Sequence, residues 1–278
     1  MFKKFFEGWY FKHQNDTQTV AIIPGISASG AFIQIITDDE SYNVNFPKEK
    51  FIKGEQVQIE NNLFSKNEIK LDIETENLVV KGQIFYHNLT PLKSDIMGPF
   101  RFLPMPCRHG IISMHHKIDG QITVNNNLFE FIGGTGYIEK DSGISFPKNY
   151  AWIQSNDFGE KCSIVAAIAD ISLCGIHFQG LICAVYYQKN QHVIATYNGG
   201  KILRCSEHEI IICNKDLRLE IRISPHKNAH NLAAPIKGTM VKVIKETPSC
   251  QANFKFFKHG KLIFDMTSSK ASFEFVQN

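Results

Sequence analysis

Several features that would place a protein in a class at once are missing from this sequence. No apolar run approaches the ~18 residues that a membrane-spanning helix requires. No block of about five like charges marks a polybasic tail. The N-terminal segment contains lysines, but it has neither the apolar stretch nor the small-residue cleavage site of a signal peptide. We therefore expect a cytoplasmic protein without stable membrane insertion.

The motifs of common cofactor-dependent and metal-dependent enzymes are also missing. There is no nucleophile elbow, P-loop, dinucleotide-binding glycine pattern or zinc signature. The seven cysteines are scattered singly, without a C-x-x-C pair, and several lie in apolar runs such as "GLICAVYY". Free buried thiols in a reducing compartment are expected. The net charge of +3 is too weak and too dispersed to indicate a nucleic-acid partner.

The sequence is rich in aromatic residues and in alternating patterns. It contains 22 Phe, and aromatic residues make up 12% of the chain, which favours strands and thick apolar layers. Apolar residues recur at every second position in "YNVNF", "NEIKLDIE" and "DLRLEIRIS", the pattern of half-buried antiparallel strands. No stretch of about ten residues has a convincing helical period. The sequence therefore predicts an all-β chain with very little helix.

The spacing of turn signals predicts many short strands. Such signals fall at 74–77, 125–127, 198–200, 258–261 and 268–270. Regularly spaced strands indicate sandwiches or barrels, and 278 residues are long for one small barrel. We predict two tightly packed lipocalin-like antiparallel β-barrel or sandwich domains, residues 1–145 and 146–278.

The segment "GYIEKDSGISFPKNYAWIQSN", residues 136–156, carries the densest group of charged and aromatic residues. On a strand, Tyr137, Glu139 and Asp141 share one face, whereas Ile138 and Lys140 share the other. Burial of two neighbouring carboxyl groups raises at least one pKa, which keeps a carboxylic acid available as a general acid near neutral pH. The alternative is a solvated turn with a surface ion pair.

Two further segments contribute polar groups. In "FEGWYFK", Trp9 and Tyr10 point to opposite faces of a strand, so only one of them enters a given cavity. The proline-rich segment "GPFRFLPMPCRHG" reads as an ordered loop or lid, in which His109 stands at the entrance of the strand that follows. A histidine there is either a structural residue or a proton-transfer group.

Taken in order, these motifs resemble the tocopherol cyclase family. The resemblance rests on "FEGWYFK", "GPF" with "CRHGIISM", "GYIEKDSG" with the following "FP", "GIHFQG" and "LEIRISPHKNAHNLAAPIKGTM". It covers about residues 5 to 270. More remotely, the sequence is similar to carotenoid hydratases and AttH-like proteins, and the resemblance implies their two lipocalin-like domains.

The resemblance also implies a reaction that needs no metal or other cofactor. It is the acid-catalysed ring closure or isomerisation of a prenylated aromatic or polyene lipid in an apolar β-barrel cavity, by an intramolecular lyase. The implied catalytic residues are Glu139, Lys140, Asp141 and His109. The implied ligand-binding residues are Trp9, Tyr10, Lys12, Phe146, Trp152 and Gln154.

The sequence departs from the family at two positions near the charged segment. Ser142 stands where the family usually has Trp, and Tyr150 stands where Trp is common. Loss of a large aromatic residue predicts a wider or wetter pocket, which would lower carboxyl pKa values. This favours an alternative function, a non-catalytic carrier of an apolar ligand. A third reading is a structural protein with filled barrels.

Overall fold

The structure, a computed structural model, describes residues 5–159, 161–173, 175–225 and 229–277. These residues form two large antiparallel sheets and three short 3-10 turns, η1 (Lys48–Lys50), η2 (Gly98–Phe102) and η3 (Thr196–Asn198). Within the described ranges there is no α-helix, and no helix that could span a membrane. The predicted all-β fold class is confirmed.

The first sheet has twelve strands in the order β4-β3-β2-β1-β12-β10-β9-β8-β7-β6-β5, with β11 paired to β10. They are β1 (Phe6–Gln14), β2 (Thr19–Ser27), β3 (Gly30–Thr37), β4 (Ser41–Phe46), β5 (Phe51–Lys53), β6 (Val57–Ile59), β7 (Asn62–Phe64), β8 (Glu68–Glu74), β9 (Val79–His87), β10 (Cys107–Val124), β11 (Asn127–Glu130) and β12 (Gly134–Gly143). The sheet folds back on itself, because Trp9 of β1 contacts Phe51 of the distant strand β5, with ring centroids 6.4 Å apart.

The second sheet has ten strands in the order β16-β15-β14-β13-β22-β21-β19-β18-β17, with β20 paired to β21. They are β13 (Tyr150–Ser155), β14 (Cys162–Leu173), β15 (Ile176–Tyr187), β16 (Asn190–Ala195), β17 (Lys201–Cys205), β18 (Glu209–Cys213), β19 (Leu217–Ile223), β20 (His230–Ile236), β21 (Thr239–Lys258) and β22 (Lys261–Val276). It also curls, since His192 of β16 packs against Phe256 of β21 at 5.2 Å.

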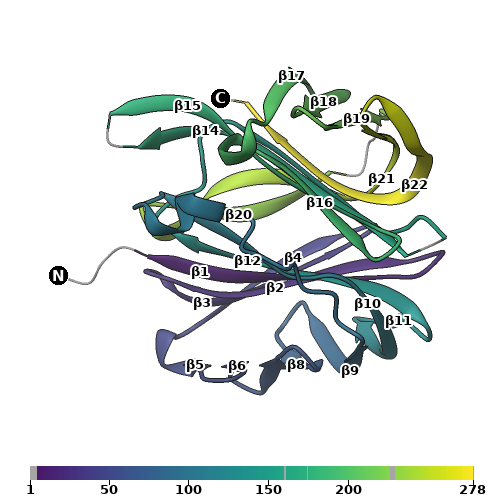
Figure 1. Cartoon of the computed structure of the whole chain (residues 1–278). Helices are drawn as coiled ribbons and strands as arrows, with labels where there is room; N and C mark the ends of the chain where they lie inside the picture. The colour runs from purple at the N-terminus through teal and green to yellow at the C-terminus, as the bar shows by residue number, and fades with distance from the viewer. Residues whose placement is uncertain (1–4, 160, 174, 226–228, 278) are drawn as a thin grey trace.

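Three apolar clusters divide the interior. One lies within the first sheet, a second within the second sheet, and a third lies where the two sheets meet. The alternation of side chains along each strand produces this division. Phe11 of β1 belongs to the first core and Tyr10 to the interface, whereas Ile153 of β13 belongs to the second core and Trp152 to the interface. Figure 1 shows the two sheets packed face to face.

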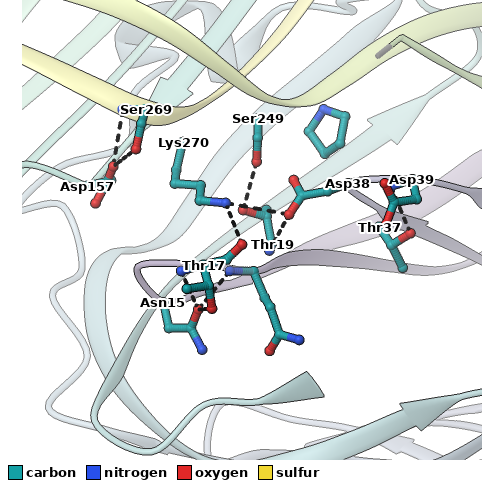
Figure 2. Close-up of polar contacts among 12 residues, drawn as sticks. Asn15, Thr17, Thr19, Thr37, Asp38, Asp39, Asp157, Ser249, Ser269 and Lys270 are labelled. Atoms are coloured by element: carbon teal, nitrogen blue, oxygen red, sulfur yellow. Dashed lines mark hydrogen bonds and ion pairs between the residues drawn. The ribbon is translucent and has the colours of Figure 1, made fainter. Parts of the chain in front are cut away.

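Part of the interface between the sheets is polar. Lys270 of β22 reaches the carbonyl oxygen of Thr17 at 3.0 Å and the carboxylate of Asp38 at 3.5 Å. The hydroxyl of Ser249 donates a 2.8 Å hydrogen bond to Thr19 (Figure 2). Together with the apolar cluster, these contacts join residues that are more than 200 positions apart in the chain.

Two local predictions have different outcomes. The turn predicted at 268–270 is wrong, because these residues lie inside β22, next to a shift in the register between β21 and β22. The predicted free thiols are found in the described part of the chain, where the free cysteines are Cys107, Cys162, Cys183, Cys205, Cys213 and Cys250. Cys174 lies outside the described residues.

Candidate active site

A cavity of about 190 Å³ lies between the two sheets. Its wall is largely apolar and takes side chains from both halves of the chain. The first half contributes Phe32 of β3 and Met97 next to η2, and the second sheet contributes Ile182, Leu232 and Ile244. The expected position inside a barrel is therefore wrong, since each sheet fills its own interior with an apolar core. The position between two domains is common for ligand sites.

One polar group in the cavity wall comes from the pairing of β10 with β12. The register places His109 directly opposite Asp141, and the His109 Nδ1 atom lies 2.9 Å from Asp141 Oδ1. On its other side, His109 Nε2 lies 3.4 Å from Glu139 Oε2. The imidazole is thus held between two carboxyl groups. We call His109, Glu139 and Asp141 the histidine cluster.

Two more side chains donate hydrogen bonds to the same oxygen of Glu139, Oε2. The hydroxyl of Tyr137 donates to Oε2 at 2.5 Å, and Nε1 of Trp152 donates at 3.3 Å. Tyr137, Glu139 and Asp141 share one face of β12, as predicted from the period of the strand. The segment is therefore part of a cavity wall, and the alternative of a solvated turn is wrong.

The histidine cluster has strongly perturbed proton affinities. Burial raises the pKa of Glu139 to about 7, and Asp141 adds to this effect while His109 opposes it. Burial lowers the pKa of His109, but the carboxylates of Glu139 and Asp141 outweigh it and raise the value to about 9. A carboxyl group with a pKa near 7 exchanges protons readily at neutral pH.

A second carboxyl pair lies in the wall formed by the second sheet. Glu246 of β21 and Glu274 of β22 are directly opposite each other in the antiparallel ladder, and both line the cavity. Tyr10 donates a 2.5 Å hydrogen bond to Glu246 Oε1, and Tyr150 donates to Glu274 Oε2. We call Glu246 and Glu274 the glutamate pair.

The environment of the glutamate pair disfavours two negative charges. Burial and the neighbouring Glu274 raise the pKa of Glu246 well above its usual range. Burial raises the pKa of Glu274 to about 7, against the opposing effects of hydrogen bonds with Tyr150 and Glu246. Like charges at directly opposed strand positions repel each other, so one proton between the two carboxyl groups is expected near neutral pH.

Two aromatic rings connect the two acidic groups. Tyr10 and Trp152 meet edge to face with ring centroids 5.3 Å apart. Each also donates a hydrogen bond to a carboxyl group, Trp152 to Glu139 and Tyr10 to Glu246. The histidine cluster of the first sheet and the glutamate pair of the second sheet are thus connected by two packed aromatic residues.

Of the predicted catalytic residues, Lys140 lies on the face of β12 opposite the cavity. Its ammonium group lies over the ring of Trp9, 5.0 Å from the centroid, and pairs with Glu7. This corrects the prediction of Lys140 as a catalytic residue, because its side chain does not line the cavity. Ser142 continues the alternation on the face of Lys140, and the cavity wall does not include it among the described residues. Its small side chain therefore does not widen the cavity.

The predicted ligand-binding residues divide into two groups. Tyr10, Phe146 and Trp152 line the cavity. Trp9 borders it, but its ring packs against Phe51 in the first core, as expected for a neighbour of Tyr10 on one strand.

Lys12 and Gln154 lie outside the cavity wall, in the polar part of the interface. Lys12 Nζ donates to Gln154 Oε1 at 3.2 Å and to the carbonyl oxygen of Lys270 at 2.6 Å. Both side chains are fully buried. They join the two sheets, which corrects their assignment to ligand binding.

The histidine cluster is also the group that could hold a metal ion. One ligand atom from each of its three residues lies within 4.8 Å of the other two. Imidazole and carboxylate ligands suit several divalent cations. Glu139 Oε2 already accepts hydrogen bonds from Tyr137 and Trp152, so an ion at this particular oxygen would compete with these donors.

The glutamate pair was missed by sequence reasoning. Glu274 stands between Phe273 and Phe275, and Glu246 stands among lysines in "KVIKET". A single charged residue in an alternating strand normally indicates the solvent-facing side. Only the packing of one sheet on the other makes these two positions internal, and the local pattern carries no signal of it.

Comparisons with known proteins identify a family model and structures that this chain resembles. The family model described as tocopherol cyclase-like matches residues 86–276, a range that contains the histidine cluster and the glutamate pair but not the opening strand β1. A search of curated proteins gave no match.

Three solved structures are similar over nearly the whole chain. A protein of Nitrosomonas europaea described as AttH is 12% identical, with a TM-score of 0.53 over 98% of this chain and 93% of its own. Kievitone hydratase from Nectria haematococca is 9% identical, with a TM-score of 0.57 over 98% and 89%. CghA with Sch210972 is 7% identical, with a TM-score of 0.62 over 99% and 89%. The predicted AttH-like two-domain fold is confirmed.

Proposed function

This chain belongs to the tocopherol cyclase-like family, and we propose that it catalyses the acid-driven ring closure or isomerisation of a prenylated aromatic or polyene lipid. The single observation that carries the proposal is the position of His109 between Glu139 and Asp141 in the wall of an apolar cavity. It supplies the two things that the reaction needs, a proton donor and a dry, shaped site.

Glu139 is the proton donor in this proposal. Its Oε2 atom accepts hydrogen bonds from Tyr137 and Trp152, so the proton resides on Oε1. With a pKa of about 7, the protonated form is well populated at neutral pH. His109, oriented by Asp141, stabilises the carboxylate that remains after transfer and restores the proton.

Ring closure then follows from the shape of the cavity. Glu139 protonates an alkene carbon of the prenyl tail, so that the π bond breaks and a tertiary carbocation forms. The phenol oxygen attacks this centre, a C–O bond forms, and the hydroxyl proton leaves. The aromatic walls formed by Tyr10, Phe146 and Trp152 hold the tail folded back on the ring and exclude water.

The test compares Glu139→Gln with Glu74→Gln, a matched change at an exposed strand position. Turnover of prenylated hydroquinones by Glu139→Gln should fall at least about a hundredfold, the usual contribution of general acid catalysis. Binding of the same compounds should stay within a few-fold in both variants. Full activity of Glu139→Gln overturns the assignment of the acid.

A second experiment, on ligand binding, separates an enzyme from a carrier. A carrier uses the apolar cavity but transfers no proton. If the wild-type protein binds prenylated phenols or polyenes with an affinity that Ala167→Phe abolishes, and no product forms, the protein is a carrier. Ala167 lines the cavity, so a large side chain there competes with the ligand for space.

A further inference from the structure

We infer that Glu246 and Glu274 form a second proton-transfer site in the cavity, which accepts the hydroxyl proton of a prenylated phenol while Glu139 supplies the proton to its alkene. This inference rests on the proposed function, and it deepens it by giving the substrate two reacting groups, a hydroxyl and an alkene. It also assigns the site to residues of both sheets.

The geometry of the glutamate pair is that of a shared proton. The two side chains leave adjacent strands at directly opposed positions, and both line the cavity. The Oε2 atom of Glu246 is buried without a hydrogen-bond donor among the described residues. Two ionised carboxylates cannot donate to each other, so one proton between them satisfies both.

The surroundings of the pair fix its charge. Tyr10 and Tyr150 donate to the outer oxygens, and the buried ammonium group of Lys12 also favours the ionised form of Glu246. Asp141, across the cavity, disfavours ionisation of Glu274. Glu246 is 0% exposed, so it does not exchange freely with bulk water. The pair therefore keeps one proton and one ionised carboxylate.

An ionised carboxylate in this place completes the proton balance of ring closure. Addition of a phenol across an alkene consumes one proton at carbon and releases one at oxygen, so the reaction is an isomerisation. The donor, Glu139, becomes a carboxylate in the first step. The glutamate pair takes up the released proton in the second step, and its negative charge stabilises the intervening carbocation. After the product leaves, both sites exchange protons with solvent through the emptied cavity, the pair by way of the partly exposed Glu274.

The two sites are placed so that one substrate molecule can contact both of them at the same time. Glu139 belongs to the first sheet and the glutamate pair to the second, and all three line the same cavity. Tyr10 and Trp152, packed at 5.3 Å, stand between them. A substrate that reaches only one site would be bound but not closed.

The first test uses isosteric variants of the pair, with Glu74→Gln as the surface control. Glu274→Gln and Glu246→Gln keep the size of the side chain, and an amide can still donate to the remaining carboxylate. We expect the variant that removes the ionised member to lose at least about a hundredfold in kcat with KM within a few-fold. The variant that replaces the protonated member should lose less than about tenfold. Wild-type turnover in both single variants and in the double variant overturns the inference.

The second test does not depend on turnover. Infrared spectroscopy of the wild-type protein at neutral pH should show the carbonyl stretch of a buried protonated carboxyl group that the double variant Glu246→Gln/Glu274→Gln lacks and Glu139→Gln keeps. If no such band exists, the inference fails even where the proposed function stands. If the band exists but Glu139→Gln is fully active, the pair survives and the assigned acid fails.

Discussion

The hydroxyl group of Tyr10, in the first strand of the chain, donates a 2.5 Å hydrogen bond to Glu246, 236 positions further on. This bond crosses from one sheet to the other and ends on a carboxyl group in the wall of the cavity. The ring of the same tyrosine packs on Trp152, which donates to Glu139. The packing of the two sheets and the chemistry of the cavity therefore depend on the same residues.

Removal of the Asp141 charge should slow catalysis because it changes the pKa of His109. In Asp141→Asn, His109 loses one of the two carboxylates that raise its pKa to about 9, so its pKa falls and Glu139 loses a charged neighbour. We expect kcat to fall about a hundredfold, ligand binding to stay within a few-fold, and the alkaline limb of the pH–kcat profile to move to lower pH. Steady-state kinetics with an NMR titration of the His109 ring measures these effects.

The control for this variant is Asp72→Asn, which changes an exposed carboxylate of β8 in the same way. It should leave the rate, the binding and the pH profile unchanged. An Asp141→Asn protein with a wild-type rate and an unshifted limb would show that Asp141 does not act through His109.

The stability of the protein should fall as pH rises from 7 to 8. The pKa of His109 is about 9 in the folded protein and near 6.5 in the unfolded chain. Its protonation therefore stabilises the fold fully below pH 6.5, and this contribution is lost as pH rises toward 9. The buried ammonium of Lys12, with its pKa lowered to about 8, acts in the opposite direction above that pH. Urea denaturation at closely spaced pH values measures the slope.

Comparison with the variant His109→Gln shows whether His109 causes this change of the free energy of unfolding with pH. A single group contributes at most about 1.4 kcal/mol per pH unit, and the wild-type protein should lose part of that amount between pH 7 and 8 relative to the variant. Parallel stability curves for the two proteins would contradict the raised pKa of His109.

A large side chain at Ala167 should block the cavity without unfolding the protein. Ala167 and Ala166 are neighbours in β14, but Ala167 faces the cavity and Ala166 faces the second core. Ala167→Phe should weaken binding of an apolar ligand more than about tenfold and change the free energy of unfolding little. Ala166→Phe should cost about 1–3 kcal/mol from overpacking and leave the affinity of the folded protein unchanged. Equal effects of the two variants on affinity would place the ligand elsewhere.

Removal of metal ions should leave turnover intact. The histidine cluster has the spacing of a cation site, but in the proposed mechanism its imidazole and carboxyl groups carry protons. Dialysis against EDTA should not change the rate, and added Zn²⁺ should inhibit because it occupies these groups. A rate that is lost on dialysis and restored by a divalent cation would indicate a metal-dependent reaction.

The alternation of residues along the chain was enough to predict the all-β class and the two faces of individual strands. Trp9 and Tyr10 separate into a core and an interface, and Glu139 and Asp141 share the cavity face, because a strand has a period of two. These are local properties. The predicted turn at 268–270 failed because the register shift that accommodates these residues depends on the partner strand.

The composition of the site depends on contacts between distant segments. His109 meets Asp141 only through the register of β10 with β12, and Glu246 meets Glu274 only through that of β21 with β22. No local pattern distinguishes a glutamate that faces solvent from one that faces a second sheet. The motifs near residue 140 therefore indicated half of the site, and the other half came from tertiary structure.

The most direct test of the account is turnover of prenylated hydroquinones in D₂O, followed by mass spectrometry of the product. Ring closure by proton transfer predicts an isomer of the substrate with one deuterium bound to carbon. Its formation should be lost in Glu139→Gln and kept in Glu74→Gln. Substrate that binds in the cavity and is recovered unchanged, or a product without deuterium at carbon, would contradict acid-catalysed ring closure.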